Sequence, residues 1–91
     1  MLVLPIKKKW FDMILSGEKK EEYREIKPYY TSRFPSTFDS FYVMFRNGYS
    51  KKSPSFIAEV KLSIGKGKEI WGAEKGQKYY ILTIINIESE K

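Results

Sequence analysis

Apolar and polar side chains alternate along the segment from Phe56 to Ile64. One set of alternate positions is apolar and consists of Phe56, Ala58, Val60, Leu62 and Ile64. The positions between them hold Ile57, Glu59, Lys61 and Ser63. Successive side chains of a β-strand point to opposite faces, so the pattern predicts a strand whose first set faces the core. We expect that set to be mostly buried and Glu59 and Lys61 to be mostly exposed, because a slip of one residue would exchange the two faces.

The remaining segments predict one domain, 1–91, with several strands and few helices. Strands are expected at 2–6, 20–26, 41–45 and 79–87, and a helix at 7–16 that Gly17 ends in a left-handed conformation. Residues 27–35 predict an irregular or briefly helical crossover, the Asn47-Gly48 pair a turn, and the glycines from 65 to 76 a basic loop. Without βαβ alternation, this order favours an α+β, mainly β fold in the form of a small β-barrel.

The charge balance and the missing residue types limit the partners and the catalytic groups that the protein can have. Seventeen Lys and Arg residues oppose eleven Asp and Glu residues, a formal charge of +6, which suits an anionic partner such as nucleic acid and, on charge alone, equally a merely soluble basic protein. The chain has neither His nor Cys, which excludes imidazole base catalysis, a cysteine nucleophile and thiolate metal sites. We expect no metal and no cofactor. No apolar stretch reaches the length of a membrane span, so a cytoplasmic protein without membrane contact is expected.

A short, highly charged strand is predicted directly after the helix. Glu22 and Arg24 are two residues apart and should project together, on the face opposite Glu21 and Tyr23. Lys19 lies just upstream, at the turn that ends the helix. An acid between two bases near a helix terminus can hold a phosphate, a base edge or a polarised amide. The alternative is a solvated edge strand whose charges discourage aggregation.

The spacing Gly17-x-Lys19-x-x-Glu22-x-Arg24 resembles the G-x-K-x-x-E-x-R signature of the ASCH superfamily. The resemblance extends over essentially the whole chain, which looks like a small stand-alone ASCH protein of the bacterial or phage type. It implies a PUA-like β-barrel with one helix after the first strand and a short helical crossover. It also implies a cleft, lined by the motif, that binds RNA or a nucleotide-like ligand.

Two enzymatic branches of that superfamily give the alternative function, in which Lys19, Glu22 and Arg24 would be the catalytic residues. Amidohydrolases of the family remove the acetyl group of N4-acetylcytidine with a Lys and a Thr of the motif. Lys19 matches that Lys, but Glu22 occupies the Thr position, where a carboxylate cannot replace the hydroxyl nucleophile. Other members are proposed to be metal-dependent ribonucleases, in which Glu22 would help to hold a cation and Lys19 or Arg24 a phosphate.

Three consecutive lysines form the start of the expected helix. Lys7, Lys8 and Lys9 lie at the positive end of the helix dipole, where cations are unfavourable unless an anion is recruited. We therefore include Lys7 and Lys8 among the candidate ligand contacts. The alternative is that all three are simply solvated.

Aromatic residues among hydrogen-bond donors suggest positions where a base stacks. Tyr49 follows Arg46 and Asn47 in a predicted turn, and stacking with flanking cations is a common way of holding unpaired bases. Trp71 lies in the glycine-rich loop and is a second candidate, unless it packs there as a lid. Trp10 is expected in the core, because it belongs to the apolar stripe of the helix. A hairpin turn with a surface Tyr is the alternative for Tyr49.

Overall fold

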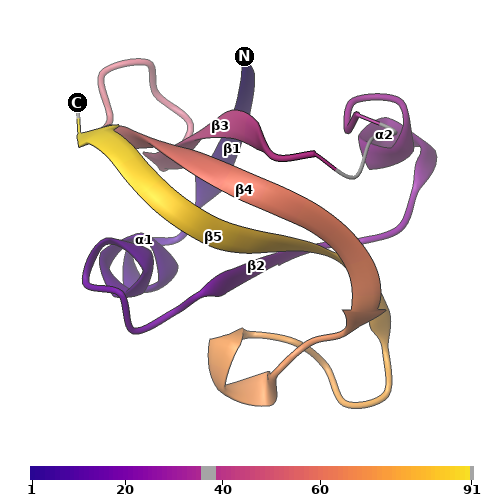
Figure 1. Cartoon of the computed structure of the whole chain (residues 1–91). Helices are drawn as coiled ribbons and strands as arrows, with labels where there is room; N and C mark the ends of the chain where they lie inside the picture. Colours follow the sequence, from indigo (N-terminus) through magenta and orange to yellow (C-terminus); the bar gives the residue numbers. More distant parts are fainter. Residues whose placement is uncertain (36–38, 91) are drawn as a thin grey trace.

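A curled five-stranded sheet, with the shape of half a barrel, forms the centre of the protein (Figure 1). This computed structural model describes residues 1–35 and 39–90. The strands are β1 (Leu2–Ile6), β2 (Glu21–Arg24), β3 (Phe41–Asn47), β4 (Ser55–Lys66) and β5 (Lys78–Glu90). Their order across the sheet is β1-β3-β4-β5-β2, so β1 and β2 are its two edges. β1 and β3 are parallel, and the other three pairs are antiparallel.

Helices are short, and the described part of the chain is α+β and mainly β, as the sequence predicts. The helix α1 (Lys8–Leu15) follows β1, and α2 (Pro28–Thr31) lies in the predicted crossover, beyond the opposite side of the sheet in Figure 1. A 3-10 turn, η1 (Glu69–Trp71), lies between β4 and β5. Gly17 follows α1 with φ +84°, a left-handed conformation that favours glycine, and its N–H donates to the Ile14 carbonyl at 3.1 Å. The predicted end of the helix is confirmed.

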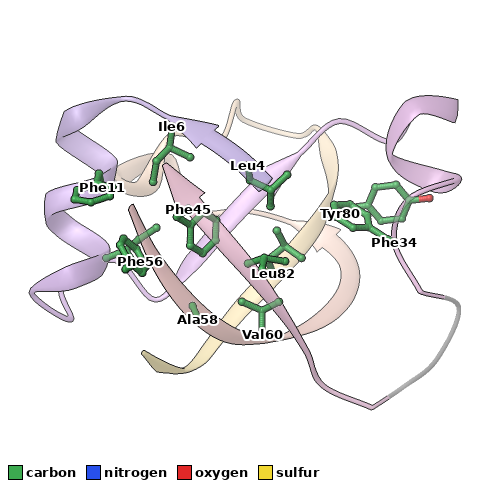
Figure 2. Packing of buried hydrophobic residues seen from close by; sticks show 12 residues of the cluster. Leu4, Ile6, Phe11, Phe34, Phe45, Phe56, Ala58, Val60, Tyr80 and Leu82 are labelled. Atoms are coloured by element: carbon green, nitrogen blue, oxygen red, sulfur yellow. The ribbon is translucent and has the colours of Figure 1, made fainter. Parts of the chain in front are cut away.

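The core fills the concave face of the sheet and is rich in aromatic rings (Figure 2). The rings of Phe11 and Phe56 have centroids 4.9 Å apart, and those of Phe45 and Phe56 are 5.5 Å apart. Further along the same face, Phe34 meets Tyr80 edge-on at 5.2 Å. The helix α1 therefore joins β3 and β4 at one end of the core, while the segment after α2 covers the other end.

The alternation in β4 is confirmed only where β3 lies beside it. Phe56, Ala58 and Val60 are fully buried and Lys61 is exposed, but Ile64 is 60% exposed, so its predicted burial is wrong. β3 pairs with β4 no further than Val60, which leaves the later residues without that neighbour.

Two further positions in the same strand depart from the predicted pattern. Leu62 is only half-buried, and so is Glu59, which was expected to be exposed. The Glu59 carboxylate accepts a hydrogen bond from Ser40 Oγ. Irregularities of register lie between Ile57 and Ala58 and between Glu59 and Val60, but at each of them the extra residue belongs to β5, so the alternation along β4 continues through them.

A second, smaller cluster lies on the convex side, under the segment that joins β4 to β5. The Tyr23 and Tyr79 rings lie 5.6 Å apart, and the Tyr23 hydroxyl accepts from the Lys68 N–H at 2.9 Å and donates to Glu21 Oε1 at 2.7 Å. Burial and the bond to Glu21 raise the pKa of Tyr23 to about 12. Gly67 lies directly against this ring. The predicted loop from 65 begins later, because Gly65 belongs to β4.

We expect Gly67→Ala to lower the free energy of unfolding by about 1–3 kcal/mol, the usual cost of an overpacked site. A Cβ at Gly67 would come within 2.6 Å of Tyr23 Cζ and 2.8 Å of the Ala73 Cβ, so the ring or the loop has to move. Gly65→Ala is the matched control, because its Cβ would lie 3.4 Å from Ile81 Cδ1, an ordinary contact. Urea titrations of both variants test this, and equal stabilities would contradict it.

Candidate functional site

The turn after α1 places Lys19 inside the protein. The Lys19 N–H donates to the Met13 carbonyl at 2.9 Å, and its ammonium donates to the Glu21 carbonyl and lies 3.2 Å from Glu22 Oε1. The rings of Trp10 and Tyr23 lie 5.2 and 5.0 Å from the same nitrogen. Lys19 is only 1% exposed, and burial lowers its pKa below the ordinary value of a lysine, while Glu22 opposes that change.

Glu22 and Arg24 point into the concave face of the sheet, as the alternation in β2 predicts. In the register with β5, Glu22 lies opposite Leu82 and Arg24 opposite Tyr80, and both of these partners belong to the core. Glu22 uses one carboxylate oxygen for Lys19 and the other for Arg24 Nη2, at 2.9 Å. The buried carboxylate is thus held between two cations.

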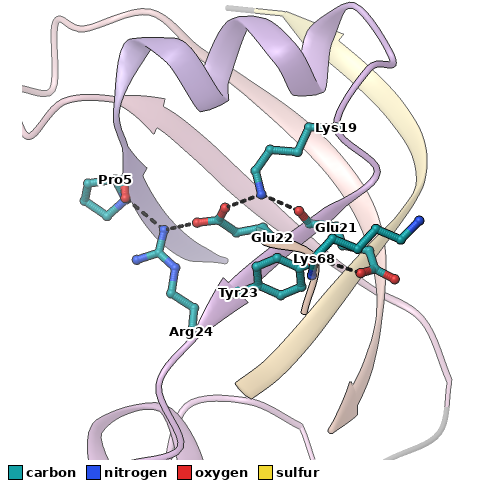
Figure 3. Close-up of polar contacts among 7 residues, drawn as sticks. All are labelled: Pro5, Lys19, Glu21, Glu22, Tyr23, Arg24 and Lys68. Carbon is teal, nitrogen blue, oxygen red and sulfur yellow. Dashed lines mark hydrogen bonds and ion pairs between the residues drawn. The ribbon is translucent and has the colours of Figure 1, made fainter. Parts of the chain in front are cut away.

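Arg24 joins the two edges of the sheet (Figure 3). Its Nη2 donates to the Pro5 carbonyl of β1 at 2.9 Å as well as to Glu22, and its Nη1 donates to the Tyr30 hydroxyl of α2 at 3.1 Å. In the closed barrel that the sequence predicts, backbone pairing would join every neighbouring strand; here one guanidinium connects β2 to β1 instead. We refer to the region between these edge strands, where Arg24 crosses, as the seam.

A cavity of about 400 Å³ opens at the seam, and we call it the seam cavity. It is bounded by the end of β1, the start of α1, β2 and the segment after β3. Its lining residues are Pro5, Ile6, Lys7, Trp10, Glu22, Arg24, Asn47, Gly48 and Tyr49. Tyr49 is 88% exposed and stands at the open side, whereas the Trp10 ring is half-buried. The cavity therefore combines two aromatic rings with two cations, one carboxylate and one amide.

Five of the predicted site residues meet in this cavity, and Arg46 lines a second cavity beside it. The five are Lys7, Glu22, Arg24, Asn47 and Tyr49. Lys19 lies behind Glu22 and is too deeply buried to touch a ligand. The prediction that its ammonium contacts the ligand is therefore wrong, and Lys19 instead supports Glu22. The predicted convergence of Lys19, Glu22 and Arg24 holds, but only the last two face the open cavity.

The other predicted residues lie elsewhere. Lys8 points to solvent, where it forms an exposed ion pair with Asp12 at 2.6 Å, and Gly17 borders a separate shallow hollow beside β5. Trp71 belongs to η1, and the Lys68 ammonium lies 4.7 Å from the centre of its ring. Trp10 was expected in the core; it is half-buried and packs against the core cluster, and it also forms a wall of the seam cavity, with the Lys9 ammonium 4.7 Å from its ring centre.

Sequence reasoning missed Pro5 and Tyr30, which fix Arg24, and Lys27, which lines the second cavity. A signal existed for two of them: Lys27 and the adjacent Tyr29-Tyr30 pair combine a cation with aromatic rings, as in single-strand binding segments. Nothing in the sequence marks the Pro5 carbonyl, because its role depends on two distant strands meeting.

The acidic groups of the described residues are scattered. In residues 1–35 and 39–90, no three of them gather where they could hold a metal ion. Glu22 is the carboxylate of the seam cavity, and both of its oxygens are already paired with cations. Such a carboxylate can orient Arg24 and accept one further hydrogen bond.

Comparison with protein-family models, with curated proteins and with solved structures finds no match for the chain. Within the described part of the chain, no helix has the length and apolar character needed to cross a membrane.

Proposed function

We propose that this protein is a binding module for RNA or a nucleotide-like ligand, and that a base of the ligand occupies the seam cavity. The observation that carries the proposal is the lining itself, in which Trp10 and Tyr49 stand beside the cations Lys7 and Arg24 and the amide of Asn47. A volume of about 400 Å³ is in the range of small-molecule sites. Stacking rings beside amide and guanidinium donors are the usual means of holding an unpaired base. The resemblance to ASCH domains and their PUA-like barrels supports the same function.

Each residue of the motif then has a distinct role. Arg24 contacts the ligand, Glu22 fixes the orientation of Arg24, and Lys19 neutralises Glu22 so that the site keeps a positive charge. Gly17 makes the turn that brings Lys19 into the protein. A cytoplasmic location, with RNA as the partner and no membrane contact, belongs to this proposal.

Binding is favoured over catalysis by the state of Glu22. A hydrolase of the amidohydrolase branch needs a hydroxyl nucleophile at this position, and a metal-dependent ribonuclease needs a carboxylate that is free to coordinate. Glu22 is instead paired on both oxygens, at 3.2 Å to Lys19 and 2.9 Å to Arg24. Its geometry suits a fixed element of a binding site.

Tyr49→Ala should weaken binding of a short single-stranded RNA by about 1–3 kcal/mol, the cost of removing one base-stacking ring. Tyr49→Phe keeps the ring and should bind nearly as well as the original protein. Because Tyr49 is 88% exposed, neither change should affect folding. Fluorescence anisotropy with a labelled hexanucleotide at several salt concentrations measures the effect.

Tyr42→Ala is the matched control, since Tyr42 is also an exposed tyrosine but belongs to β3 outside the seam cavity. If Tyr49→Ala and Tyr42→Ala bind equally well, the seam cavity is not the binding site. If the original protein shows no salt-dependent affinity for the RNA, the proposed function is wrong altogether.

A further inference from the structure

A second cavity, of about 480 Å³, adjoins the seam cavity on the other side of Arg24. We call it the arginine cavity. Its lining residues are Val3, Pro5, Arg24, Lys27, Tyr29, Tyr30, Arg46 and Tyr49. Three of these, Pro5, Arg24 and Tyr49, also line the seam cavity. The two cavities are therefore neighbours with a common wall, and one extended ligand can occupy both.

The charge of the arginine cavity is positive. Arg24, Lys27 and Arg46 contribute three cations to the lining, and no carboxylate belongs to it among the described residues. Glu22 neutralises part of the charge of Arg24 from the seam side, but it is shared with the buried Lys19. An anion that enters this cavity meets uncompensated positive charge in a partly enclosed site, where the attraction is stronger than on an open surface.

Two guanidinium groups of this wall have hydrogen-bonding capacity that the described residues do not use. The Nε atoms of Arg24 and Arg46 are both shielded from solvent and have no hydrogen-bond partner within residues 1–35 and 39–90. An unsatisfied buried donor is unfavourable, and guanidinium groups are suited to oxygen acceptors of phosphate. A small rotation of either side chain as an anion enters would satisfy these donors.

Tyr30 holds two of the cations in place. Its ring lies 5.8 Å from the Arg24 guanidinium carbon and 5.6 Å from the Lys27 ammonium, and its hydroxyl accepts a bond from Arg24. The neighbouring Tyr29 is half-exposed at the rim, with the Arg33 guanidinium 3.7 Å from its ring centre. A cation cluster with a half-exposed tyrosine at its rim suits a strand of nucleic acid that continues past the first base.

We propose that the arginine cavity binds a phosphodiester group of single-stranded RNA, so that the ligand spans both cavities and contains at least two nucleotides. This inference rests on the proposed function for the base in the seam cavity. Arg24, at the common wall, contacts the ligand from both sides. Arg46 and Lys27 contact only the phosphate, and they distinguish an oligonucleotide from a free nucleoside.

Arg46→Gln and Lys27→Gln test the inference in the full chain. Each should weaken binding of a uridine tetranucleotide about 10- to 100-fold, as expected for losing one charge-assisted contact. Each should also reduce the slope of log affinity against log salt by about 0.7, the value for one lost phosphate contact on a single strand. Neither should change the weaker binding of uridine, measured by NMR titration. Lys61→Gln, on the exposed part of β4, removes the same charge and should leave all three quantities unchanged.

The Nε–H signals of Arg24 and Arg46 in ¹⁵N NMR spectra give a second, direct readout. The Arg46 signal should shift with the dinucleotide UpU but not with uridine, whereas the Arg24 signal, at the common wall, should shift with both. If Tyr49→Ala weakens tetranucleotide binding but Arg46→Gln and Lys27→Gln behave like Lys61→Gln, the inference is wrong and the proposed function stands. If neither uridine nor RNA binds, while diethyl phosphate still shifts both signals, the proposed function fails and the cavity is an anion site of another kind. Lys27 is exposed, so its variant remains informative if Arg46→Gln does not fold.

Discussion

Glu22→Gln is expected to destabilise the protein by about 3–5 kcal/mol at neutral pH, the cost of removing one partner of a buried ion pair. Lys19 has a fully buried side chain, and Glu22 is its counter-charge at 3.2 Å. Gln has the same shape but no charge, so the variant must hold an uncompensated ammonium or release its proton. Domains of this size are stable by about 5–15 kcal/mol, so the loss is a large fraction of the total. Urea denaturation monitored by Trp fluorescence measures it.

The pH dependence of that loss identifies its cause. Burial already lowers the pKa of Lys19 in the folded state, and removing Glu22 takes away the main influence that raises it. Since the unfolded chain then binds a proton more readily than the folded one, stability increases with pH between the folded and unfolded pKa values. The deficit of Glu22→Gln should therefore shrink as the pH rises towards about 10, where a lysine in the unfolded chain loses its charge.

Glu18→Gln provides the control for net charge, because Glu18 is exposed beside the same turn. It should change the free energy of unfolding by less than about 0.5 kcal/mol, as is usual for surface substitutions. If the deficit of Glu22→Gln is as small as that of Glu18→Gln, or does not change with pH, Lys19 is not held as a buried ammonium by Glu22.

Local patterns predict the elements and the face of the charged strand, but not how deeply each charge is buried. Helical spacing followed by glycine predicts the end of α1 at Gly17, and a period of two places Glu22 and Arg24 on one side of β2. The burial of Lys19 depends on the rings of Trp10 and Tyr23 closing over it, and Tyr23 itself is fixed by Lys68. Contacts across forty-five residues of sequence leave no local signal.

The same limit explains the errors in β4 and at the seam. Ile64 satisfies the strand alternation, yet its burial depends on whether β3 extends far enough to lie beside it, which the composition of β4 cannot show. Arg24 is correctly expected in a site, but its bond to Pro5 depends on the two edge strands of the sheet approaching each other. Both the exposure of Ile64 and the bond from Arg24 to Pro5 depend on how the strands are arranged in the sheet, which local sequence patterns do not show.

The half-barrel explains why a charged motif lies where a core residue would otherwise be. The strands β1, β3, β4 and β5 all contribute apolar side chains to the concave face. In contrast, β2 contributes Glu22 and Arg24, which lie opposite Leu82 and Tyr80. With backbone pairing absent between β1 and β2 in the described sheet, polar side chains at this edge can bond across the seam and still reach a cavity. The same residues therefore hold the edges together and line the candidate site.

Arg24→Met is expected to lower the free energy of unfolding by about 2–4 kcal/mol, because it removes charge-assisted hydrogen bonds and leaves buried acceptors unpaired. The lost partners are the Pro5 carbonyl, the Glu22 carboxylate and the Tyr30 hydroxyl. Met fills much of the same volume, so the loss reports on polar contacts rather than on a cavity. Arg24→Lys restores the charge but not the forked geometry, and should recover only part of the loss.

Amide hydrogen exchange shows where the loss occurs. If Arg24 joins the edges of the sheet, the amides of β1 and β2 should exchange faster in Arg24→Met, while those in the centre of β4 should change only as much as global stability does. Arg33→Met removes the same charge from an exposed position and should cost less than about 1 kcal/mol. Equal stability of the two variants, or faster exchange spread evenly over all strands, would show that the edges are held together by the core alone and that Arg24 is free to serve only a ligand.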